Sequence, residues 1–429
     1  MILKLKMNLL KTSVLNGVAV LIKTATMFIL NKILAVYVGP SGYAAIGQFQ
    51  NFIQMITTFA GSAVNTAVVK YTAEYHEDET KQKTVWKTAG SIVLLFSFIF
   101  TFLVLIFHQT LSLWIFKTEA YGSILIWFAI FLIFFNLNAL LLAILNGKKE
   151  IVKLITANIA GSLFSLTITG LLAVRFGVYG ALVALSIYQS LNFIVTLYLS
   201  YKSEWFEFSY IWGRIDPEIL KKIVAFALMA LVSAVCVPLS QMVIRSYLVH
   251  EYSATYAGYW EAMIRLSAAY LMLVTTTLSV YYLPRLSELT NIKEIRKEVY
   301  LGYKFIFPLA VIGGSIVYLL KDWIIPLLFS TDFLPMRELF LWQMIGDTLK
   351  IGGWILAYLM LGKAMTKLFI STEIIFACSS IVLTYFCTQF FGFEGVSIAH
   401  LVNYALYWVA MSYFVFAVLK DRENSFGKE

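Results

Sequence analysis

The chain has 429 residues, of which 60% are hydrophobic and only 13% are charged, and its formal net charge is +9. Soluble domains are about 45–50% apolar and about 25% charged, so this composition excludes an ordinary soluble fold. The basic residues form short clusters between apolar runs and no aromatic-interleaved stripe, which argues against a nucleic-acid partner. The composition therefore predicts an integral membrane protein.

Apolar segments long enough to cross a bilayer, which takes about 20 residues as a helix, recur along the whole chain. In the first half they lie at 12–38, 42–72, 88–108, 122–146, 154–176 and 180–201. After a polar stretch, they lie at 222–249, 257–283, 299–321, 336–362, 368–391 and 395–419. We expect an all-α membrane protein of about 12 transmembrane helices. Its expected parts are an N-terminal six-helix lobe (1–201), a cytoplasmic linker (202–221) and a C-terminal six-helix lobe (222–429).

The distribution of Lys and Arg predicts the orientation. Most of the 33 basic residues lie in the connections on the side of the N-terminus, the 202–221 linker and the C-terminus. The opposite connections are short, and Lys117 is their only basic residue. The positive-inside rule then places both termini in the cytoplasm.

The two halves of the chain resemble each other at the ends of some predicted helices. The sequence NGKKEIVKLI at 146–155 is similar to LGKAMTKLFI at 361–370, and FGVYG at 176–180 is similar to FGFEG at 391–395. Gly177 and Gly392 are 215 positions apart, which is about half the chain. An even number of helices in each half predicts a parallel repeat, as in some transporters.

Catalytic and metal-binding signatures are missing from the sequence. Cys236, Cys378 and Cys387 lie in apolar segments, without a His at metal-ligand spacing, and the four His are scattered. No zinc-protease, phosphate-loop or Ser/His/Asp pattern is present. We therefore expect no enzyme activity, cofactor or metal site.

Three lysines in the first half are candidates for binding an anion. Lys23 lies about 24 Å of helix before Gly39 and about 18 Å after Lys11, too far to reach either membrane surface comfortably. Lys32 and Lys70 lie nearer to the helix ends, where snorkelling to the surface is the alternative. Because the membrane segments of this half contain no Asp or Glu, a substrate anion could supply the missing charge.

Charged residues of the second half occur at helical spacing. Glu261 and Arg265 are four positions apart, and Asp347 and Lys350 are three apart, so each pair lies on one helix face. Each pair could have a role in gating or ion coupling. Alternatively, the two charges of a pair could simply neutralise each other, so that the helix can insert into the membrane. Glu373 has no local partner and is a separate candidate for protonation.

Polar residues at several membrane positions could line a cavity and contact a glycan. They could equally be packing contacts between helices. Gln343, Asp347, Lys350 and Trp354 form one stripe along the predicted 336–362 helix. The other candidates for glycan contact are Gln50, Asn51, Gln54, His400 and Asn403.

Five stretches of the chain resemble a known family. They are KILAVYVGPSG at 32–42, VVKYTAEYHED at 68–78, FALMALVSAVCVP at 226–238, SVYYLPRLSELT at 279–290 and MRELFLWQMIGDTLKIGGWILAYLMLGKA at 336–364. On these stretches the chain is identified as a member of the lipid III and O-antigen flippases. That family belongs to the multidrug/oligosaccharidyl-lipid/polysaccharide exporter superfamily and carries undecaprenyl-pyrophosphate-linked oligosaccharides, such as O-antigen or enterobacterial common antigen units.

The resemblance implies two six-helix lobes around a central cavity that opens alternately to the cytoplasm and the periplasm, in a bacterial inner membrane. It implies that Lys23, Lys32 and Lys70 attract the pyrophosphate of the substrate, while the polyprenyl tail stays in lipid. It also implies coupling to H⁺ or Na⁺, for which Asp347, Glu261 and Glu373 are the available carboxylates.

Three alternative functions remain open. A drug/cation antiporter of the same superfamily would favour acidic residues in the first-half cavity, which here is basic. A membrane-embedded glycan polymerase or ligase usually has a large periplasmic loop, and the predicted outer connections are short. A scaffold for glycan assembly would not need Lys23 in the membrane, although contact with a polymerase stays open.

Overall fold

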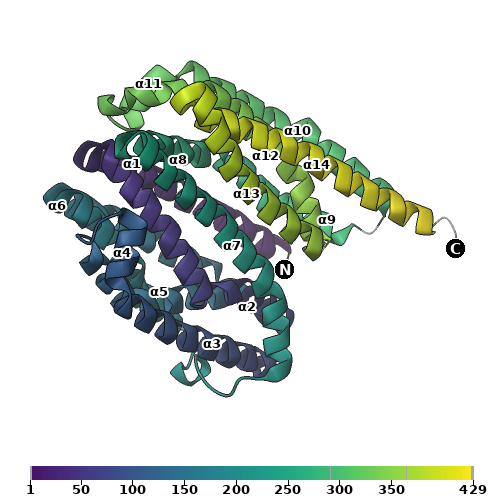
Figure 1. Ribbon diagram of the computed structural model, residues 1–429. Helices are drawn as coiled ribbons and strands as arrows, with labels where there is room; N and C mark the ends of the chain where they lie inside the picture. Colours follow the sequence, from purple (N-terminus) through teal and green to yellow (C-terminus); the bar gives the residue numbers. More distant parts are fainter. Residues whose placement is uncertain (1, 290, 364, 427–429) are drawn as a thin grey trace. The chain divides into compact units, whose positions relative to one another are not determined.

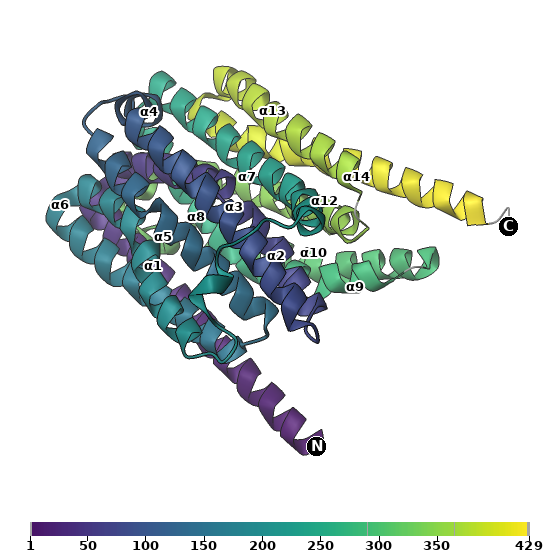
Figure 2. The same cartoon turned by 90° about the horizontal axis from the view of Figure 1, so that it is seen from below.

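The computed structural model describes residues 2–289, 291–363 and 365–426, and none of these residues lies in a β-strand. The chain is built from helices throughout (Figures 1 and 2). Within the described residues, 8 helical stretches are long and apolar enough to cross a membrane. The prediction of an all-α, multi-pass membrane protein is thus confirmed.

The chain divides into two compact units, Met1–Pro238 and Leu239–Glu429, and the division falls within helix α7. The first unit contains α1 (Ile2–Phe59), α2 (Asn65–Glu74), α3 (Glu79–Ile106), α4 (His108–Phe116), α5 (Gly122–Gly147), α6 (Ile151–Tyr201) and the start of α7 (Pro217–Glu251). The second contains α8 (Ala254–Thr277), α9 (Leu283–Glu288), α10 (Ile292–Leu319), α11 (Lys321–Leu328), α12 (Phe340–Gly362), α13 (Thr366–Phe391) and α14 (Gly395–Phe426). A π-helical turn, Leu278–Tyr282, joins α8 to α9.

Helix α1 reverses direction at Gly39, although its helical turns continue on both sides of that residue. Gly39 has φ 69° and ψ 179°, and Pro40 follows it. The Tyr43 hydroxyl donates a hydrogen bond of 2.7 Å to the carbonyl oxygen of Asn31. In a straight helix these residues would be about 18 Å apart along the axis, so the contact requires the chain to fold back.

The same reversal occurs at two positions that the sequence comparison had matched. Gly177 has φ 57° and ψ −135°, and Gly392 has φ 62° and ψ −149°. After each turn, a glycine at the start of the second helical part packs against the helical part before the turn. A Cβ at Gly180 would collide with the carbonyl oxygen of Leu172, and one at Gly395 with that of Cys387. The local repeat between the two halves is therefore confirmed at this turn.

Asp78 fixes the start of α3. Its side chain accepts a hydrogen bond of 3.0 Å from the backbone N–H of Lys81, which satisfies one of the unpaired donors of the first turn. That hydrogen bond also lowers the pKa of the Asp78 carboxyl group. The following residues of α3 pack through Val85, Trp86 and Ala89 into the core of the first unit.

Helix α12 runs through the core of the second unit. Its buried face includes Ile351, Ile355 and Leu356. Helix α14 packs closely against α12, and this packing requires glycine at position 346. A Cβ at Gly346 would lie only 2.5 Å from Cδ2 of His400. This approach brings His400 beside the polar face of α12.

Candidate functional site

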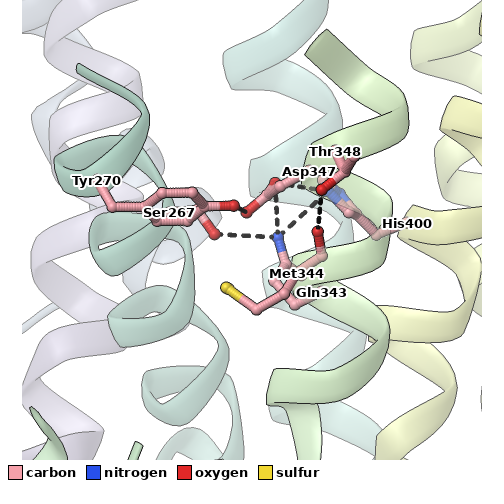
Figure 3. Close-up of polar contacts among 7 residues, drawn as sticks. All are labelled: Ser267, Tyr270, Gln343, Met344, Asp347, Thr348 and His400. Atoms are coloured by element: carbon pink, nitrogen blue, oxygen red, sulfur yellow. Dashed lines mark hydrogen bonds and ion pairs between the residues drawn. The ribbon is translucent and has the colours of Figure 1, made fainter. Parts of the chain in front are cut away.

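A buried carboxylate on α12 is the centre of a polar cluster in the second unit (Figure 3). The Asp347 side chain is 0% exposed. The Tyr270 hydroxyl of α8 donates to its Oδ2 at 3.0 Å, and His400 Nε2 of α14 lies 3.0 Å from its Oδ1. Two other helices therefore contact this one charge.

Gln343 connects this carboxylate to its neighbours. Its Nε2 lies 3.3 Å from Ser267 Oγ, 3.2 Å from His400 Nε2 and 3.4 Å from Asp347 Oδ1. A hydrogen bond from His400 to an ionised Asp347 carboxylate, which only accepts, requires the proton on His400 Nε2, and the Gln343 amide then lies beside that nitrogen without a hydrogen bond to it. The cluster is thus a hydrogen-bonded Asp–His pair, supported by an amide and two hydroxyl groups.

Lys350 does not form the ion pair with Asp347 that the spacing suggested. In the described part of the chain no carboxylate oxygen lies within 4.0 Å of its Nζ. Its Nζ instead lies 4.7 Å from the ring centroid of Trp354 and 5.2 Å from that of Tyr404. The Asp347 carboxylate is held toward α8 and α14, while Lys350 lies one helical turn further along, over aromatic faces. Glu373, half-buried on α13, interacts electrostatically with Lys350.

A second buried charge cluster lies on α7 and α8. Arg265 Nε donates to Glu261 Oε1 at 2.8 Å, which confirms the predicted pair. The other carboxylate oxygen lies 2.5 Å from Nη2 of Arg245, whose side chain is only 2% exposed. Sequence reasoning missed Arg245, although it is the only basic residue between Ile223 and Val249. Two guanidinium groups therefore share one carboxylate.

The first-unit candidates lie on α1 and α2. Lys23 is exposed and Lys32 half-buried on the first leg of α1, and Lys70 on α2 is exposed, with its Nζ 5.0 Å from the ring centroid of Tyr71. The predicted glycan contacts Gln50, Asn51 and Gln54 lie on the second leg of α1, and only Asn51 is buried.

The structure brings together Gln343, Asp347 and His400 among the sequence candidates and adds Ser267 and Tyr270, which were not foreseen. Asn403 is buried on α14, and its Oδ1, like Gln343 Oε1, has no hydrogen-bond partner within the described residues. No group of three or more His, Cys, Asp or Glu that could hold a metal ion occurs among the residues described.

Comparison with known proteins decides the family. Residues 9–290 match the family described as polysaccharide biosynthesis protein. The chain belongs to this family. Two of its relatives are the lipid III flippases of Escherichia coli (strain K12) and Shigella flexneri, each 30% identical over 403 residues, with 94% of this chain and 97% of the relative covered. The predicted resemblance is confirmed.

Solved structures show that the fold of this family member is that of known transporters. A multidrug resistance MATE family transporter of the MOP superfamily, in an inward-facing conformation, aligns with a TM-score of 0.75 at 14% identity, over 94% of this chain and 96% of its own. The lipid II flippase MurJ aligns with a TM-score of 0.73 at 16% identity, over 95% and 87%. At these identities the likeness concerns the fold alone.

Proposed function

We propose that the protein is a flippase, not an enzyme, that moves an undecaprenyl-pyrophosphate-linked oligosaccharide from the cytoplasmic to the periplasmic leaflet of a bacterial inner membrane. The observation that carries this proposal is the 30% identity to lipid III flippases over nearly the full length of both chains. The hydrophilic glycan and its pyrophosphate cannot cross the hydrocarbon core unaided, because burying unpaired polar and charged groups there is costly. A polar pathway through the protein removes that cost.

For this transport we assign the chain a topology of twelve passes with both termini in the cytoplasm. Three of the 8 candidate stretches contain the reversals at Gly39, Gly177 or Gly392, and these stretches supply two passes each. Helix α8, with 24 residues, supplies the remaining pass. Six passes in each half would form two lobes around a central cavity that opens alternately to each side.

The head group of the substrate is assigned to the basic residues Lys23, Lys32 and Lys70. Pyrophosphate carries negative charge, and a cavity lined by one sign of charge raises the local concentration of the opposite sign. The polar side chains of Gln50, Asn51, Gln54, Trp354 and Asn403 are assigned to the glycan.

Ion coupling is assigned to the Asp347 cluster. Asp347 is buried, and its partner His400 is partly exposed, so a proton or Na⁺ could reach the carboxylate by way of the imidazole side of the cluster. Glu261 with Arg265, and Lys350 with Glu373, are assigned to gating.

The test is rescue of surface glycan in a bacterium that lacks its own lipid III flippase. Rescue is expected, together with loss of the lipid-linked intermediate that accumulates in the deletion strain. Continued accumulation, with the protein present in the membrane at normal level, would contradict transport of this substrate. Export of cationic dyes by the same cells would favour the drug antiporter instead.

A further inference from the structure

The polar stretch between α6 and α7 is fastened to the side of α3. The Ser91 hydroxyl donates to the Gly213 carbonyl oxygen at 2.8 Å and accepts from the Gly213 N–H at 2.9 Å. The Asp216 N–H donates to Thr88 Oγ1 at 3.1 Å. At Gly90 a Cβ would collide with the carbonyl oxygen of Ile211, so glycine permits this close approach. Residues 203–216 are therefore an ordered part of the first unit.

One side of the 203–216 segment packs into the protein. The ring of Trp205 lies 5.3 Å from that of the buried Trp86, and its Nε1 donates to Glu150 Oε1 at 3.2 Å. Phe206 is buried in the core of the first unit. These contacts determine which side chains of the segment point outward.

The outward side chains are large and apolar. Phe208 is 58% exposed and Trp212 is 69% exposed, and the exposed Tyr201 at the end of α6 lies beside Phe208, with ring centroids 6.3 Å apart. Such a cluster is unfavourable in water and usually marks a contact with another apolar phase.

Basic side chains lie in and beside the segment, which also carries the exposed carboxylates of Glu204 and Glu207. Lys202 Nζ lies 4.4 Å from the ring centroid of Tyr198, and Lys83 Nζ lies 4.8 Å from that of Tyr210. Arg214 is exposed at the end of the segment. Aromatic rings flanked by Lys and Arg are the composition that anchors proteins at the membrane–water boundary.

The length of α3 places the segment at that boundary. Counting about 20 residues back from Ile106, the end of α3, gives Lys87 as the other edge of the hydrocarbon core. Thr88 and Ser91, which hold the segment, lie within one turn or so of this edge. At this level an exposed side chain is within reach of the head groups and upper acyl chains of the lipids.

We infer that residues 203–216 bind the lipid surface of the bilayer, with Phe208 and Trp212 inserted at the acyl boundary and Lys202 and Arg214 directed to anionic lipid head groups. The segment thereby fixes the depth of the first unit in the membrane. This inference stands on α3 and its contacts, and it does not depend on the transported substrate.

The test measures the depth of a spin label in vesicles that contain zwitterionic and anionic glycerophospholipids. Cys236, Cys378 and Cys387 are first replaced by Ser, and Trp212→Cys is then labelled with a nitroxide. Glu204→Cys, on the same segment but in a polar exposed position, is the matched control. Phe208→Cys provides a second site if the Trp212 variant does not accumulate.

Collisions with oxygen, which concentrates in lipid, should exceed those with a water-soluble nickel chelate severalfold at position 212, and the ratio should be reversed at position 204. Equal, water-like ratios at both positions would overturn the inference. Exclusion of both reagents from position 212 would also overturn it, because protein would then cover the site. Removing the anionic lipid should reduce the contrast, which tests the role of the basic residues.

Discussion

Asp347 and His400 show how single residues acquire a role from their partners. The sequence selected Asp347 for ion coupling and His400 for glycan contact, and the fold places their side chains 3.0 Å apart. Tyr270, on a third helix, completes the set of donors to the carboxylate. The chemistry of the cluster therefore belongs to the group of residues and not to any one of them.

The Asp347–His400 contact predicts strong coupling between the two positions. Asp347→Asn and His400→Gln should each reduce glycan export. The double variant should export about as much glycan as whichever single variant exports less. In thermal unfolding of the purified protein, a double-mutant cycle should give an interaction energy of about 0.5–3 kcal/mol. The control is Thr348→Val, because within the described residues the Thr348 hydroxyl donates only to the Met344 carbonyl oxygen of its own helix. Additive losses would show that the pair does not act together.

The buried Arg245–Glu261–Arg265 cluster predicts a large effect on stability. Glu261→Gln removes the carboxylate that the buried Arg245 and the half-buried Arg265 share, and breaking a buried ion pair costs about 3–5 kcal/mol. Arg245→Met combined with Glu261→Gln should recover part of this loss, because the more deeply buried positive charge is then removed together with the carboxylate. Chemical denaturation in detergent measures both. Equal stability of Glu261→Gln and the unaltered protein would contradict the burial of this cluster.

Lys23 tests the assignment of the head-group site. Lys23→Ala should abolish glycan export while expression and membrane insertion stay normal, because the positive charge for the pyrophosphate is lost. Lys23→Arg keeps that charge and should retain export, whereas Lys81→Ala, at the exposed start of α3, should have little effect. Normal export by Lys23→Ala would rule out an anion site at this position.

Individual helices end or reverse where glycine permits it. Gly177 and Gly392 adopt nearly the same dihedral angles in the two halves of the chain, with positive φ and strongly negative ψ. Residues with a Cβ are disfavoured in this region, whatever the space around them. The repeated glycines in the sequence therefore correspond to a repeated backbone conformation.

The reversal predicts a cost for alanine at either glycine. Gly177→Ala and Gly392→Ala should each destabilise the protein by about 1–3 kcal/mol, because the backbone is strained in the native turn. Gly17→Ala, in a helical position with nothing within 4 Å of the added Cβ, should be neutral or slightly stabilising. Thermal unfolding of the three variants compares them directly. Equal behaviour of Gly177→Ala and Gly17→Ala would contradict the strained turn.

Across the whole molecule, the basic connections predict a single orientation in the membrane. Reporter fusions should show the C-terminus and the turn at Lys149 in the cytoplasm, with fluorescent-protein fusions active and alkaline phosphatase fusions inactive. A fusion at the Gly177 turn should give the opposite pattern, because one pass separates it from Lys149. The same pattern at both turns would contradict a crossing between them.

The sequence by itself determined that the chain is an all-α membrane protein, and it located the reversals at Gly177 and Gly392. Within lipid every backbone group must be paired inside its own segment, so long apolar runs can only become helices. Glycine at a helix end likewise acts through its own dihedral angles. These properties are local, and they can therefore be read from consecutive residues.

Only the tertiary structure decided which charges meet. Helical spacing suggested that Asp347 pairs with Lys350. In the structure the Asp347 carboxylate instead contacts His400, which lies 53 positions further along the chain on another helix. Arg245 joined Glu261 and Arg265 in the same way, from a different helix. Helix periodicity determines which face a side chain occupies, whereas its partner depends on the helix that packs against that face. That choice follows from contacts between distant segments, which are set by small residues such as Gly346 and by the fit of whole helix surfaces.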